Sequence, residues 1–152
     1  MADYRDDQIS VLNELIQTCK DGAEGFQHAA EGVQDPDLRT LFTRYSEQRR
    51  QFTAELQTEV RRLGGDPDKT GSVSGALHRG WIDIKSAVTG KDDAAIISEA
   101  ERGEDVAVKT YEDALKKSLP ADLESIIRRQ YSEVKSVHDR VRSLEMARTG
   151  KT

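Results

Sequence analysis

The sequence has few residues that cross-link or interrupt a fold. Its 152 residues include one cysteine, three prolines and only 5% aromatic residues. The single cysteine, Cys19, excludes an internal disulfide, and the first ten residues, MADYRDDQIS, lack the apolar run of a signal peptide. We therefore expect a cytoplasmic protein in a reducing compartment.

The sequence also lacks an excess of positive charge. Its formal net charge is −5 and its pI is near 5.3. Contacts to phosphate groups need clustered lysine and arginine, so this balance argues against nucleic-acid or anionic-membrane partners. The C-terminal segment MARTGKT adds only two cations, which disfavours DNA protection by a basic tail. With 34% charged residues, the chain is also too polar for a membrane span.

The scarcity of helix-breaking residues favours long helices. Asp35 followed by Pro36 suits the start of a helix, whereas Gly64, Gly90 and Pro120 mark the positions where helices end. We predict helices over 5–33, 37–63, 72–89, 93–117 and 121–147. They form a single domain over residues 1–152, with a crossover at about 64–92.

Apolar residues recur at helical spacing in each of these segments. Four long apolar stripes bury one another best as an all-α four-helix bundle. Short turns would make two antiparallel hairpins, and the crossover helix would carry the chain back along the bundle in a ferritin-like arrangement. An up-and-down bundle with a side helix is the alternative. The expected stripe of the crossover helix contains Val73, Leu77, Trp81, Ile84 and Val88, with Trp81 as its anchor.

Four stretches resemble a known family: NELIQTCKDGAEGF, LHRGWIDIKSAV, ERGEDVAVKTYEDAL and RQYSEVKSVHDRVRSL. They are similar to a small bacterial group within the ferritin-like superfamily, catalogued as a domain of unknown function. The resemblance covers about residues 9–144. It implies the four-helix fold with its crossover and a link to stress or low-oxygen physiology, but no established reaction.

Ferritin-like metalloproteins suggest a test of the interior. Their di-metal members place a Glu on each of two helices and a Glu-x-x-His pair on each of the other two. In this sequence Glu104 lies at the centre of the buried stripe of helix 93–117. The corresponding inward positions on the other long helices hold Cys19, Arg49 and His138, and Lys135 stands three residues before His138. The Glu-x-x-His motif is therefore absent.

These positions predict a buried polar layer in place of a di-metal site. One carboxylate cannot neutralise two divalent cations, and a buried arginine would repel them, so we expect Glu104 to pair with Arg49. We predict no catalytic residue and no required cofactor. The predicted layer contains Cys19, Arg49, Glu104, His138 and Lys135.

Simpler interpretations apply to two of these side chains. Cys19 on an apolar stripe is most often a small core residue, and His138 is more often a satisfied core histidine than a metal ligand.

The predicted function is a non-catalytic, stress-associated protein that self-associates, with a homodimer as one form. The alternative is a metal-binding oxidase or peroxidase with iron or manganese on a degenerate site of Glu104, His138 and Glu101.

Overall fold

A computed structural model describes residues 2–67, 78–81 and 83–149, which form five α-helices and one 3-10 helix and contain no strand. The all-α prediction is confirmed. The long helices begin and end within three residues of the predicted limits. The elements are α1 (Ala2–Gly32), α2 (Pro36–Arg62), η2 (His78–Trp81), α4 (Ile84–Thr89), α5 (Asp93–Leu115) and α6 (Ala121–Thr149).

Acidic side chains fix the starts of α2 and α5. The Asp35 carboxylate accepts a hydrogen bond from the Asp37 backbone N–H at 2.8 Å, and Pro36 occupies the first turn of α2. Asp93, in the first turn of α5, accepts bonds from the backbone N–H groups of Gln34 at 2.7 Å and Asp35 at 3.1 Å. The start of α5 is therefore bonded to the turn between α1 and α2.

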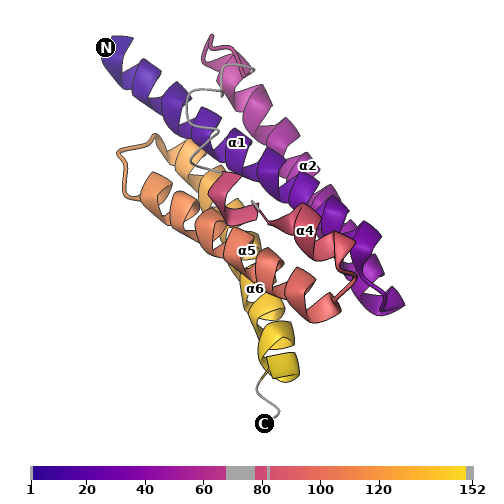
Figure 1. Cartoon of the computed structure of the whole chain (residues 1–152). Coiled ribbons are helices and arrows are strands. Elements are labelled where there is room, and N and C mark those ends of the chain that lie inside the picture. Colours follow the sequence, from indigo (N-terminus) through magenta and orange to yellow (C-terminus); the bar gives the residue numbers. More distant parts are fainter. Residues whose placement is uncertain (1, 68–77, 82, 150–152) are drawn as a thin grey trace.

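The four long helices form two antiparallel hairpins, α1 with α2 and α5 with α6, and α1 also packs against α5 (Figure 1). Because α5 starts beside the α1–α2 turn, α2 and α5 begin at the same end of the molecule (Figure 1). The chain must therefore return along the helices between the end of α2 and the start of α5. The contacts among the long helices place α2 and α5 diagonally opposite each other.

The prediction of one continuous crossover helix is wrong for the described part of this segment. The 3-10 helix η2 ends at Trp81, and α4 begins at Ile84. Val73 and Leu77 of the predicted stripe lie outside the described residues. The crossover backbone approaches α5 closely here, because a Cβ atom on Gly80 would lie only 2.9 Å from the Cα atom of Gly103. Glycine at both positions leaves no side chain between the two backbones.

Trp81 joins the crossover to the long helices, as its predicted role as an anchor requires. The buried indole fills a notch between two glycines, Gly25 on α1 and Gly103 on α5. A Cβ atom on either glycine would lie 2.2 Å from the indole ring. The indole also meets the Phe26 ring edge to face, with ring centroids 5.0 Å apart. Only residues without a side chain at these two positions permit the observed packing.

The apolar core is divided into two clusters along the bundle. The first includes Leu15, Leu56, Tyr111 and Ile127, and the second includes Phe26, Phe42, Trp81, Ile97 and Val141. On α2 and α5, Arg49 and Glu104 fall between the residues of the first cluster and those of the second. The described helices thus enclose a polar group between two apolar layers. No helix in the described ranges has the length and apolarity needed to cross a membrane.

Candidate functional site

The centre of the bundle holds a two-pronged ion pair between α2 and α5. Arg49 Nη1 lies 2.7 Å from Glu104 Oε2, and Arg49 Nη2 lies 2.5 Å from Glu104 Oε1. The exposed fractions of the two side chains are 1% and 0%. Two parallel N–H···O bonds between ionised groups are among the strongest hydrogen bonds in proteins. The structure therefore brings together the two charged residues at the centre of the predicted layer.

The surroundings of Arg49 fit a permanently charged guanidinium. Its Cζ atom lies 5.5 Å from the centroid of the Phe26 ring, and its Nε donates to Gln48 Oε1 at 3.3 Å. Burial disfavours the charged form, but the adjacent Glu104 carboxylate outweighs burial and holds the pKa of Arg49 above its ordinary value. On α1, a Cβ atom at Gly22 would lie 3.0 Å from Nη1, so this glycine leaves room for the guanidinium.

Cys19 belongs to a chain of polar contacts that leads from the interior to the α2–α6 side of the bundle. Its Sγ lies 3.1 Å from the Tyr111 hydroxyl, which donates to Gln130 Oε1 at 2.7 Å. Gln130 Nε2 in turn donates to Glu55 Oε1 at 2.8 Å. Burial raises the pKa of Cys19 to about 11, and burial also raises the pKa of Tyr111 well above its usual value. The buried thiol is protonated at neutral pH and is a poor nucleophile.

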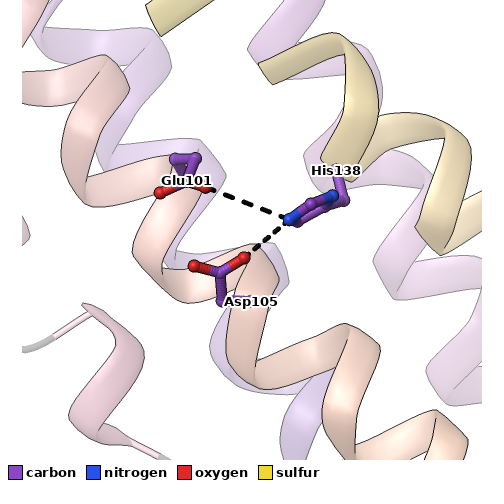
Figure 2. A group of neighbouring side chains, drawn as sticks. All are labelled: Glu101, Asp105 and His138. Carbon is purple, nitrogen blue, oxygen red and sulfur yellow. Dashed lines mark hydrogen bonds and ion pairs between the residues drawn. The ribbon is translucent and has the colours of Figure 1, made fainter. Parts of the chain in front are cut away.

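A second polar group lies between α5 and α6 (Figure 2). His138 Nε2 lies 2.6 Å from Asp105 Oδ1 and 4.0 Å from Glu101 Oε2. The exposed fractions of the side chains are 11% for His138, 17% for Glu101 and 55% for Asp105. One ligand atom from each residue can be chosen so that all three lie within 4.8 Å of one another. We call Glu101, Asp105 and His138 the α5–α6 triad.

The other nitrogen of His138 is also bonded to a carboxylate. Nδ1 lies 3.1 Å from Asp139 Oδ1, and Lys135 Nζ donates to the same carboxylate at 2.8 Å. Burial opposes protonation of the imidazole, but the hydrogen bonds to Asp139 and Asp105 outweigh it and raise the pKa of His138. For Glu101, burial and then the neighbouring charges of Asp105 and Glu145 raise the carboxyl pKa.

A comparison with known protein families adds one result. The model of the family described as Domain of unknown function (DUF2383) matches residues 7–117. The chain belongs to this family. No curated protein matches the chain. The matched range of this DUF2383 protein includes Cys19, Arg49 and Glu104, whereas His138 lies beyond it on α6.

The structure separates residues that the sequence analysis grouped as one layer. Arg49 and Glu104 lie together, and Cys19 lies near enough that both charges affect its pKa. His138 bonds instead to Asp105 and Asp139. The prediction for Lys135 is wrong, because its side chain is 43% exposed and pairs with Asp139 outside the interior. A lysine one helical turn from its acidic partner gains more from that local pair than from burial.

The predicted metal candidates also fall into different places. Glu101 and His138 lie in the α5–α6 triad, whereas both oxygens of Glu104 accept hydrogen bonds from Arg49. Asp105, which lies one residue after Glu104, was not among the predicted site residues. Its spacing of four residues from Glu101 is the signal that could have identified it, because such residues share a helix face.

The interior group of this DUF2383 protein does not fit a di-metal centre. Around the Arg49–Glu104 pair its polar side chains include the protonated thiol of Cys19, the phenol of Tyr111 and the amide of Gln130. Two divalent cations need several anionic or imidazole ligands, and a guanidinium repels them. The α5–α6 triad has a different donor set, one imidazole and two carboxylates, with Asp105 in contact with solvent.

Proposed function

We propose that this DUF2383 protein is a bacterial, ferritin-like four-helix bundle without catalytic activity, in which the Arg49–Glu104 ion pair takes the place of a di-metal centre. The observation that carries the proposal is the burial of a complete ion pair between two apolar clusters. Two antiparallel hairpins with a returning crossover support the ferritin-like assignment.

The chemistry of the pair supports a structural role. Arg49 and Glu104 neutralise each other, and each side chain satisfies the other's hydrogen-bonding groups. A charged pair that fits only one alignment penalises other alignments of the helices, because a shift would leave a buried charge without its partner. We therefore assign to this pair the fixing of the register between α2 and α5. The alternative is an oxidase or peroxidase site built on Glu104 and His138 together. The structure does not favour it, because Glu104 bonds to Arg49 whereas His138 bonds to Asp105 and Asp139.

Metal analysis tests the proposal directly. The protein is purified from cells grown with added iron or manganese, and bound metal is measured for the wild type and for Glu104→Gln. The expected result is no metal whose binding depends on Glu104, and oxidation of iron(II) by oxygen or peroxide no faster than in protein-free buffer. Stoichiometric metal that Glu104→Gln removes while the helical circular-dichroism signal is retained would overturn it.

The proposal has three further parts: a cytoplasmic location, which the single cysteine supports, a role under stress, which the resemblance to ferritin-like proteins supports, and self-association. Sedimentation velocity over a range of protein concentrations tests self-association, and a single species with the mass of one chain would contradict it. Protein abundance in cells with and without oxygen limitation tests the stress association, and equal abundance would contradict that part alone.

A further inference from the structure

We propose that the α5–α6 triad is a binding site for one first-row divalent transition-metal ion, separate from the interior ion pair. Glu101 and Asp105 are four residues apart on α5, so their carboxylates project from the same face of that helix. His138 on α6 points its Nε2 atom between them (Figure 2). Two neighbouring helices of one hairpin thus supply three ligands of two chemical kinds.

The spacing of the three ligand atoms suits a single ion after small side-chain rotations. Ligands about 2.0–2.2 Å from a zinc ion lie roughly 3–3.5 Å from one another. The distances from His138 Nε2 are 2.6 Å to Asp105 and 4.0 Å to Glu101, one shorter and one longer than this spacing. The short contact is a hydrogen bond, so the ion would replace the shared proton and draw Glu101 inward.

The contacts of His138 on its other side are those of a metal ligand. Metal-binding histidines usually donate the second ring N–H to a carboxylate, which orients the ring and fixes its tautomer. Asp139 is placed to accept from Nδ1, and Lys135 holds the Asp139 carboxylate in position. In this tautomer the lone pair of Nε2 faces Glu101 and Asp105, where the ion would bind.

Glu101 provides a separate reason to expect a cation. Its side chain is mostly buried, yet among the described residues it accepts no hydrogen bond; His138 Nε2 approaches it at 4.0 Å, and the more distant charge of Arg142 also acts on it. A mostly buried carboxylate without a donor is unfavourable, and the adjacent Asp105 charge adds to the cost. A divalent ion would satisfy both carboxylates at once.

The ligand types select the class of ion. One imidazole with two carboxylates suits zinc, manganese, iron(II), cobalt and nickel, whereas calcium and magnesium prefer oxygen ligands alone and copper(I) prefers sulfur. Because 55% of the Asp105 side chain is exposed, solvent can reach the ion and complete its coordination. The site is therefore open, and zinc(II) is a suitable probe because it has no redox chemistry.

Calorimetric titration of the full chain with zinc(II) at pH 7.5 tests the site. We expect one ion per chain, and we expect His138→Ala to abolish this binding. His28→Ala is the matched control, since His28 also lies beside an acidic residue, Glu31, on a long helix, and it should bind as the wild type does. Equal loss in both variants, or no loss in His138→Ala, would identify adventitious surface binding and overturn the proposal.

The carboxylates are tested in the same way. Asp105→Asn should weaken zinc binding by at least tenfold, whereas Asp113→Asn, which changes a similarly exposed carboxylate two turns further along α5, should leave it unchanged. Equal affinities for the two variants would contradict the assignment of Asp105. Glu104→Gln should retain the ion, so metal that this variant removes would count against the proposed function and not against this site.

Asp139 is a positioning residue, and its role has a spectroscopic signature. Asp139→Asn should weaken binding by about 10- to 100-fold. The chain has three histidines, so the imidazole nitrogen resonances can be assigned by substitution. In the wild type, zinc should shift the Nε2 resonance of His138, and in Asp139→Asn the tautomer balance of the metal-free ring should change. An unchanged tautomer balance with unchanged affinity would remove Asp139 from the site.

Discussion

The Arg49 guanidinium and the Glu104 carboxylate form both hydrogen bonds of their ion pair inside the bundle, across the diagonal from α2 to α5. The apolar clusters on either side shield the pair from water. Electrostatic attraction between the two charges is strong in such surroundings. The free-energy cost of removing both charges from water is also large. The net contribution of the pair to stability is therefore smaller than its geometry suggests.

This balance predicts a large difference between single and double substitutions. Arg49→Leu and Glu104→Leu should each lower the free energy of unfolding by about 3–5 kcal/mol, because each leaves an uncompensated buried charge. The double variant should be close to the wild type or more stable by about 1–4 kcal/mol. Urea denaturation followed by circular dichroism measures all three.

A matched pair at the surface provides the control. Arg128 and Glu124 form an ion pair on α6 with exposed fractions of 62% and 44%, and single substitutions there should change stability by less than about 1 kcal/mol. If Arg49→Leu alone were as stable as the wild type, the buried pair would not have the role assigned to it. A double variant less stable than either single one would also contradict the argument.

The notch around Trp81 predicts that replacing Gly103 by alanine destabilises the protein, contrary to the usual effect of this substitution in a helix. Alanine usually stabilises a helix relative to glycine by about 1 kcal/mol. Gly103→Ala should nevertheless destabilise the protein by about 1–3 kcal/mol, because the new methyl group would overlap the indole. The chain has one tryptophan, so its fluorescence reports whether the crossover stays in place, and we expect a red-shifted emission in this variant.

Two controls test this prediction: an alanine at a glycine that does not touch Trp81, and Gly103→Ala in a chain with a smaller side chain at position 81. A Cβ atom on Gly90 would meet nothing closer than 3.6 Å, so Gly90→Ala should shift neither stability nor emission appreciably. In the background of Trp81→Leu, the cost of Gly103→Ala should fall because the smaller side chain leaves space for the methyl group. A cost that is the same with tryptophan and with leucine would show that the notch is not its cause.

Helical periodicity predicted the parts of the structure that depend on one helix at a time. It placed Glu104 and Arg49 inward because each interrupts an apolar stripe, and capping residues predicted the start of α2. Periodicity could not predict which polar residues meet across two helices. Asp105 was left out of the predicted site for this reason, since its partner His138 lies on another helix. Lys135 was misplaced for a different reason, because its partner Asp139 lies one turn further along the same helix.

The crossover shows a second limit of the sequence pattern. Its apolar spacing is compatible with one helix, but the described backbone is divided between η2 and α4. The position of Trp81 depends on two glycines of other helices, Gly25 and Gly103, which form the notch for its indole. A glycine has no side chain to contribute to an apolar stripe, so its role becomes visible only when the partner helix is in place.

The buried thiol of Cys19 predicts a loss of stability at alkaline pH. Its pKa rises from 9.0 to about 11 on folding, so the folded state holds the proton more tightly than the unfolded chain. The resulting contribution to the free energy of unfolding is complete below pH 9. It is lost as the pH rises from 9 towards 11, because in this range the unfolded chain releases the proton and is stabilised, whereas the folded chain keeps it. The loss is on the order of 2–3 kcal/mol, and urea denaturation at pH 7 and pH 10.5 measures it.

Two variants separate Cys19 from its neighbour. The Tyr111 hydroxyl, 3.1 Å from Sγ, also has a raised pKa and adds a loss of the same sign at higher pH. Cys19→Ala should therefore reduce the decrease in stability between pH 7 and pH 10.5, and Tyr111→Phe should reduce its steeper part above pH 10.

At neutral pH the native thiol should react with iodoacetamide much more slowly than the thiol of the urea-unfolded chain, since it is buried and protonated. A native thiol that reacts as fast as the unfolded one would show that Cys19 is neither shielded from solvent nor held in its protonated form.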